Sequence, residues 1–176
     1  MRTALSIAGA AIFVLTAAGT ALAQGSGAEA RLKQLNITLP ADQAPAANFV
    51  NSVQAGKLLF LSGNTPGGQW PLKGKVGKDP TIEQGYDSAR QTGLIMLGKI
   101  RTALGSLDRV KRVVKVLGMV NSADGFSDQP KVVNGFSDLM VEVFGEAIGK
   151  HARSAVGMAG LPGNAPVEVE MIVEVE

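Results

Sequence analysis

The sequence of 176 residues contains no cysteine and only one histidine, His151. Without cysteine the chain can form neither a disulfide nor a zinc–thiolate site, and no thiol can serve as a nucleophile. A single histidine also excludes a metal site built from several imidazoles. We therefore expect no metal and no other cofactor, and stability that comes from packing, including packing between subunits.

The chain has almost no excess of one charge sign, because its 17 lysines and arginines are nearly balanced by 15 aspartates and glutamates. The basic cluster Arg109–Arg112 is interpreted as the solvated start of a strand. Aromatic residues make up 5% of the chain and are not interleaved with basic residues. Nucleic acids are bound through many clustered cations and stacking aromatics, so we expect no nucleic-acid partner.

Long apolar runs are absent except near the N-terminus. Arg2 precedes an apolar run from Ala4 to Ala18, and the small-x-small motif Ala21-Leu22-Ala23 follows. This order is typical of a cleavable secretion signal over residues 1–23, and the run is shorter than the ~20 residues of a membrane span. We expect cleavage before Gln24, no membrane contact afterwards, and a secreted protein, in the bacterial periplasm.

The remaining length is sufficient for one domain with its own core. Residues 24–44 are interpreted as a tether and lead-in, and residues 45–176 as the domain. Within the first segment, Gln24 to about Ala30 is rich in small residues and is typical of a flexible tether. Arg31–Thr38 could form a short helix or a strand.

Hydrophobic patterning predicts strands alternating with helices. The last strand is the clearest, because Val167 to Glu176 alternates apolar and acidic residues with a period of two. Asp79-Pro80 is typical of a helix start, and glycine follows each helix pattern. We expect an α+β fold with two helices on one face of a mixed sheet. The strands are expected at 57–62, 108–121 and 167–176, with a possible short one near 74–76, and the helices at 80–104 and 130–144.

Several short motifs resemble the RidA/YjgF superfamily, in its YjgF/chorismate-mutase-like branch, also called endoribonuclease L-PSP-like. The resemblance covers about residues 45–176. It is carried by Ser62-Gly63-Asn64 after a strand, Val133-Asn134 on the second helix, Arg153-Ser154, Leu161-Pro162, and Val167-Glu168-Val169-Glu170.

This resemblance implies a chorismate-mutase-like fold and homotrimers in which the sheets surround a central barrel, with ligand clefts between subunits. Active members of the family hydrolyse enamine and imine intermediates to 2-oxo acids and ammonia. It implies that Arg153 holds the carboxylate of a small ligand and that Glu168 activates water, the catalytic role. Ser62, Asn134 and Phe49 would line the cleft as further substrate-binding residues.

Two positions depart from the active members of the family. Ala155 follows Arg153-Ser154 where they carry cysteine, and Phe49 stands where they carry tyrosine. Three functions therefore remain open: an imine deaminase, a non-catalytic trimer that binds small carboxylates, and a structural or chaperone-like protein. His151 is interpreted as a surface histidine, and Trp70 as the anchor of its own loop.

Overall fold

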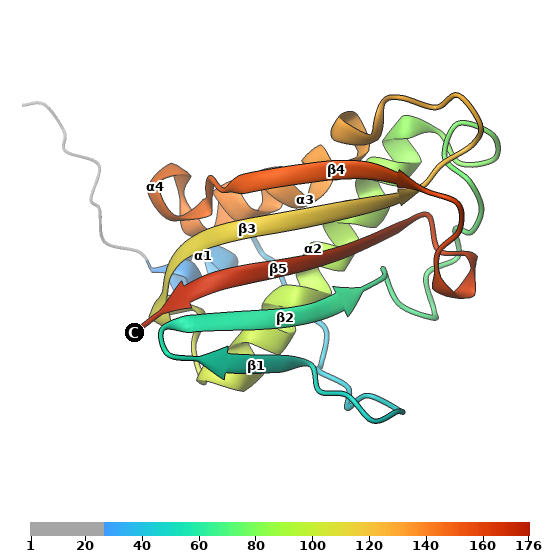
Figure 1. Ribbon diagram of the computed structural model, residues 1–176. Helices are drawn as coiled ribbons and strands as arrows, with labels where there is room; N and C mark the ends of the chain where they lie inside the picture. Colours follow the sequence, from blue (N-terminus) through green and yellow to red (C-terminus); the bar gives the residue numbers. More distant parts are fainter. Residues whose placement is uncertain (1–26) are drawn as a thin grey trace, which may run out of the picture.

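The computed structural model describes residues 27–176, so the expected secretion signal and its cleavage position lie outside the described residues. A five-stranded sheet forms one layer and two long helices form the other (Figure 1). This arrangement confirms the expected α+β class. The strands are β1 (Ser52–Ala55), β2 (Leu58–Asn64), β3 (Val110–Asn121), β4 (Ala152–Met158) and β5 (Val167–Val175), and the helices are α1 (Ala28–Gln34), α2 (Ile82–Leu104), α3 (Gln129–Phe144) and α4 (Glu146–Gly149).

The strand order is β1-β2-β5-β3-β4, with β5 at the centre. Neighbouring strands pair in antiparallel fashion except β3 and β4, which are parallel. The chain passes from β3 to β4 through α3 and α4. The alternation expected for the last strand is confirmed, because Val167, Val169 and Val173 are buried under the helices while Glu168 and Glu170 lie on the other face. The main core therefore lies between the sheet and α2 and α3.

The start of α2 differs from the expectation by two residues. Thr81, rather than Asp79, is the N-cap, because Thr81 and Gln84 form a reciprocal capping box. Thr81 Oγ1 accepts a hydrogen bond from the Gln84 amide at 3.2 Å, and Gln84 Oε1 accepts one from the Thr81 amide at 2.9 Å. The helix ends as predicted at Gly105, whose φ of 81° is left-handed.

Glycines inside α2 permit close packing against α3 and against the lead-in segment. A side chain at Gly93 would collide with Leu139 of α3, and one at Gly98 would collide with the carbonyl oxygen of Pro40. From α3, a side chain at Gly135 would overlap the carbonyl oxygen of Tyr86 in α2. The two helices therefore approach each other at glycine positions, and the lead-in segment lies directly on α2.

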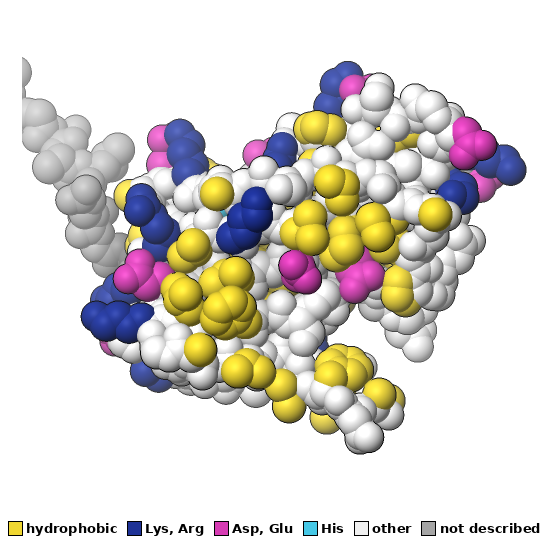
Figure 2. Space-filling model, viewed as in Figure 1, with side chains coloured by type: hydrophobic (Ala, Val, Ile, Leu, Met, Phe, Trp, Pro, Cys, Tyr) yellow, Lys and Arg dark blue, Asp and Glu magenta, His cyan; other side chains and the backbone are white. Residues whose placement is uncertain are grey.

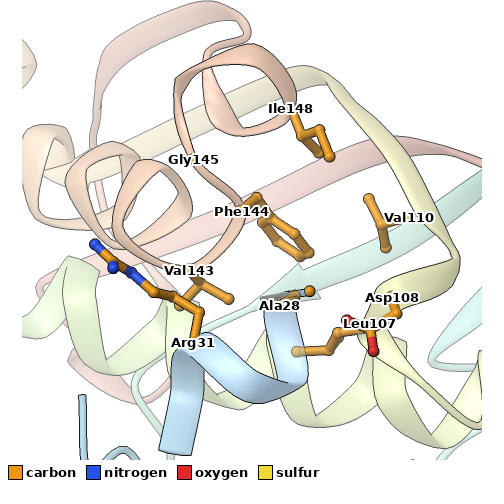
Figure 3. A pocket seen from close by; sticks show the side chains of 10 residues that line it. Ala28, Arg31, Leu107, Asp108, Val110, Val143, Phe144, Gly145 and Ile148 are labelled. Atoms are coloured by element: carbon orange, nitrogen blue, oxygen red, sulfur yellow. The ribbon is translucent and has the colours of Figure 1, made fainter. Parts of the chain in front are cut away.

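Residues 28–34 form α1 rather than the flexible tether that the composition favours up to residue 30. Ala28 and Leu32 are buried against the domain, and both Glu29 carboxylate oxygens accept hydrogen bonds from Arg101, at 3.0 and 2.7 Å. A pocket of about 270 Å³ lies where α1 meets α3 and the start of β3. Figure 3 shows apolar side chains directed into this pocket, whereas Arg31 points away from it.

The face of the sheet opposite the helices carries exposed apolar side chains. Figure 2 shows them gathered over the strands, with a few charged groups between them. Within one subunit β3 is covered on one face, because its side chains largely alternate between buried and partly or fully exposed. The most exposed apolar side chains of the strands are Val53 (56%), Phe60 (40%), Val156 (39%) and Met158 (37%).

Candidate functional site

Glu168 lies near the start of β5, on the open face, where β5 runs beside the end of β2. Gly63 of β2 lies directly beside the Glu168 side chain, because a Cβ atom at Gly63 would overlap the Glu168 carboxylate. The Ser62-Gly63-Asn64 motif therefore has a steric role: it leaves room for the carboxylate beside the backbone. A larger residue at position 63 would displace Glu168.

The charge on Glu168 is poorly stabilised by its surroundings. Burial raises the pKa of this carboxyl above its ordinary value, and the negative charge of Glu170 raises it further. No hydrogen bond from the described residues offsets these effects on the Glu168 pKa. A carboxylate in this condition binds a proton more readily than an exposed glutamate, as a general base requires.

An open cavity of about 730 Å³ begins at Glu168 and lies between the loop after β2 and the lead-in segment. Figure 2 shows the molecule hollowed beside the end of β2. Phe49, one of the predicted substrate-binding residues, lines this cavity with Glu168. Asn64 and Trp70 also line it; Trp70 donates a hydrogen bond from Nε1 to Ser88 Oγ at 3.0 Å. Trp70 thus anchors its loop, as predicted, and also forms part of the cavity wall.

Ser62 does not share the cavity of Glu168. Its hydroxyl donates to the carbonyl oxygen of Val50 at 2.7 Å, and it borders a separate depression of about 270 Å³ on the open face. Glu170 and Lys115 line the same depression. Ser62 therefore joins β2 to the segment before β1. Its hydroxyl oxygen can still accept a hydrogen bond from a ligand.

Arg153 lies on edge strand β4 and turns toward α3. Its Nη1 donates to Asn134 Oδ1 and to Ser137 Oγ, both at 2.9 Å, while Nη2 makes only a long contact of 3.5 Å with the carbonyl oxygen of Pro130. Both Nη1 hydrogens are therefore engaged, and the edge formed by Nε and Nη2 is left for a ligand. A carboxylate is bound by two parallel donors of this kind.

Asn134 was expected to line the cleft, and the structure places it as a partner of Arg153. Ser137, one helical turn further along α3, was not singled out from the sequence. Its spacing from Asn134 puts both side chains on one face of the helix, which is the only signal that could have indicated it.

One subunit does not bring Arg153 and Glu168 together. Arg153 pairs with Val116 of β3, and Glu168 pairs with Met119 further along the same strand. Arg153 contacts α3 on the helical side of the sheet, whereas Glu168 lies on the open side. A site that uses both residues therefore requires a second copy of the chain.

Within residues 27–176 no group of three or more metal-binding side chains occurs. In the same part of the chain, none of the helices has the length and apolar character needed to cross a bilayer.

Comparison with known proteins identifies the family. A family model described as "YjgF/chorismate mutase-like, putative endoribonuclease" matches residues 29–175. The chain belongs to this YjgF/chorismate mutase-like family. Among curated relatives, Protein TCP17 of Trypanosoma cruzi is 47% identical over 149 residues, which cover 82% of this chain and 92% of that protein. A 2-iminobutanoate/2-iminopropanoate deaminase of Dermatophagoides farinae is 29% identical, over 80% of this chain and 95% of that enzyme.

Two solved structures with substantial sequence identity show the same fold. A protein from Shewanella oneidensis, described as a "putative endoribonuclease", superposes with a TM-score of 0.81 at 30% identity, over 85% of this chain and all of that one. A protein of unknown function from Agrobacterium tumefaciens gives a TM-score of 0.76 at 40% identity, over 84% of this chain and 91% of that one. The resemblance drawn from the sequence motifs is thereby confirmed at the level of family and fold.

Proposed function

We propose that this protein binds small 2-oxo or 2-imino acids in a cleft between subunits and hydrolyses the imines. The observation that carries the proposal is the geometry of Arg153. Asn134 and Ser137 hold Nη1, so the guanidinium is oriented before any ligand arrives and its Nε–Nη2 edge is presented. An oriented arginine loses little freedom on binding a carboxylate, which favours affinity.

Glu168 supplies the chemistry of hydrolysis in this proposal. An iminium carbon is already electrophilic, so a positioned water and a base suffice. The Glu168 carboxylate takes a proton from the water as the water oxygen bonds to the iminium carbon, which gives a carbinolamine. Glu168 then returns this proton to the nitrogen and takes up the hydroxyl proton of the carbinolamine as the C–N bond breaks. A 2-oxo acid and ammonia leave, and Glu168 releases its proton to the solvent. The raised pKa of Glu168 suits both transfers.

The named deaminase relative supports this reaction class, and the apolar open face supports the assembly that would bring Arg153 and Glu168 from different subunits into one cleft. We further infer that the assembly is a homotrimer, as in the expectation from the sequence. The export expected from residues 1–23 would place the activity in the bacterial periplasm.

A non-catalytic binding protein is the second candidate. Ala155 and Phe49 replace the thiol and the hydroxyl that the family resemblance led us to expect, and Phe49 lines the same cavity as Glu168. These substitutions remove polar groups near the reacting atoms but leave Arg153 and its partners intact. Binding would then persist without hydrolysis.

Calorimetric titration of 2-oxobutanoate separates these candidates when it is combined with ammonia release from freshly generated 2-iminobutanoate. Arg153→Ala should weaken binding at least about tenfold, because charged hydrogen bonds are worth about 1.5–3 kcal/mol. Arg153→Lys should restore binding only in part, since an ammonium does not reproduce the planar fork. Glu168→Gln should bind normally and release no ammonia.

Arg90→Ala is the matched control, because Arg90 forms an ion pair with Glu142 on the helical layer, away from the proposed cleft. Unchanged affinity in Arg153→Ala would refute the ligand role. Normal binding with no ammonia release by the unmodified protein would select the non-catalytic candidate.

A further inference from the structure

His151 is not the surface histidine that the sequence suggests. It precedes β4 by one residue and is partly buried, with its ring edge-on to Phe136 at a centroid distance of 6.5 Å and an interplanar angle of 81°. Its Nδ1 lies 2.6 Å from the carbonyl oxygen of Gly149, and its Nε2 lies 3.0 Å from Ser137 Oγ. Ser137 is also a partner of Arg153, so the histidine and the arginine share one hydroxyl.

The chemistry of the donors and acceptors fixes the direction of each hydrogen bond that links Gly149, His151, Ser137 and Arg153. The Gly149 carbonyl can only accept, so Nδ1 carries the hydrogen of the ring. Arg153 can only donate, so Ser137 Oγ accepts from it and directs its own hydrogen to His151 Nε2. All of these groups are satisfied together when His151 is neutral, and the Ser137 hydroxyl is then fixed in its orientation toward the guanidinium.

The surroundings of the ring favour this neutral form. Burial lowers the pKa of His151 and the positive charge of Arg153 lowers it further, while the Gly149 carbonyl acts in the opposite sense. Other charged groups are engaged elsewhere: Lys150 pairs with Glu146 of α4 at 2.7 Å, and Lys115 of β3 donates to Ser154. From α3 the ring meets Ser137 and Phe136, which carry no charge.

We propose that His151 is a positioning residue for Arg153, acting through the hydroxyl of Ser137 to hold the guanidinium with its Nε–Nη2 edge presented. Protonation of His151 turns Nε2 into a donor, so the Ser137 hydroxyl loses its acceptor and lies between two cations. The arginine is then held less firmly and repelled by the imidazolium. Carboxylate binding weakens as the pH falls through the pKa of His151. This inference rests on the proposed function of Arg153.

Two substitutions of His151 separate titration from packing. His151→Gln keeps an amide oxygen that can accept from Ser137 and has no charge at any pH. His151→Phe keeps an aromatic ring against Phe136 and removes both nitrogens. Each is made in a Glu168→Gln background, so that titration of Glu168 contributes nothing to the profile.

Calorimetry with 2-oxobutanoate between about pH 4 and about pH 8 extends below the ordinary range of histidine titration, because the pKa of His151 is lowered. With His151 present, affinity should fall about three- to tenfold on acidification, the value of one lost hydrogen bond. His151→Gln should bind equally well across the range. His151→Phe and Ser137→Ala should bind weakly at every pH. An acid-side loss of the same size in His151→Gln would overturn the proposal.

A second measurement needs no ligand, because the chain has one histidine and its imidazole gives a single set of ring resonances in proton NMR. Arg153→Gln should raise the pKa of His151 by removing the neighbouring cation. An unchanged His151 pKa in this variant would overturn the coupling between the two residues. Failure of the unmodified protein to bind 2-oxobutanoate at any pH would instead overturn the proposed function.

Discussion

At the scale of single residues, Glu168 carries a charge that the folded chain disfavours. Burial and the charge of Glu170 both raise its pKa, so the folded state holds a proton at this position more tightly than the unfolded chain does. Titratable groups with strongly shifted pKa values are characteristic of functional sites, where they lower the stability of the fold.

The raised pKa of Glu168 has a measurable consequence for the stability of Glu168→Gln. A carboxyl group whose pKa is higher in the folded state than in the unfolded state stabilises the fold when it is protonated, below its unfolded pKa. This contribution to the free energy of unfolding is lost as the pH rises through the folded-state pKa. We therefore expect Glu168→Gln to raise the thermal unfolding midpoint at pH ~7 and to have a negligible effect well below the ordinary glutamate pKa. Calorimetric scans at the two pH values measure this. Glu83→Gln on exposed α2 is a control of opposite sign, because hydrogen bonds at the start of the helix hold the pKa of Glu83 below its ordinary value. A lower midpoint at neutral pH would contradict the prediction.

The sequence indicated Glu168 and Arg153 as candidate site residues because each lies in a motif with a recognisable spacing. It could not indicate that Ser137 and His151 support Arg153, because these contacts join α3 to the segment before β4 and depend on the packing of both. The role of Ser62 as a link to Val50 was hidden for the same reason: the carbonyl it binds belongs to a segment without regular structure.

At the scale of elements, long strands and helices were predictable and short edge elements were not. β4 has the sequence of a poor strand, since Val156 is its one β-branched residue, and it is held by parallel pairing with β3 alone. β1 has four residues. α1 is seven residues long and is fixed by the contact of Glu29 with Arg101, 72 residues away. Long-range contacts of this kind decide the state of short segments whatever their local propensity.

The close approach of α2 and α3 predicts a strong effect of Gly135→Ala. The added methyl group would overlap the carbonyl oxygen of Tyr86, which is backbone and can yield only if the helices separate. We expect a loss of about 1–3 kcal/mol in the free energy of unfolding, as for other overpacked cores. Chemical denaturation measures this loss. Gly160→Ala is the matched control, because a side chain there has no neighbour within 4 Å; equal effects of both substitutions would refute the packing argument.

At the scale of the whole molecule, the open face of the sheet resembles half of an interface. Apolar side chains gathered on one surface of this kind mark sites of association in soluble proteins. The separation of Arg153 and Glu168 within one subunit points in the same direction, since the proposed site that uses both residues requires a second copy of the chain.

We predict that Phe60→Glu prevents assembly. Phe60 lies on β2 with 40% of its surface exposed, and a carboxylate in the apolar interface would be buried without a partner. Light scattering should show a mass near three protomers for the unmodified protein and near one for the variant. Ala103→Glu on the exposed side of α2 should remain assembled. A monomer in the unmodified protein at micromolar concentration would contradict the proposed trimer.

The central place of β5 also governs the order in which the chain can fold. β5 follows every other strand in the sequence, yet it lies between β2 and β3 and pairs with both. A chain emerging from the ribosome has β1 and β2 on one side and β3 and β4 on the other, with nothing to join them until β5 appears. Synthesis must therefore be almost complete before the sheet closes, and a chain that ends before Val167 can form only the separate pairs β1–β2 and β3–β4. If the export signal expected at the N-terminus operates, late closure of the sheet would favour a chain that a secretion channel can still accept.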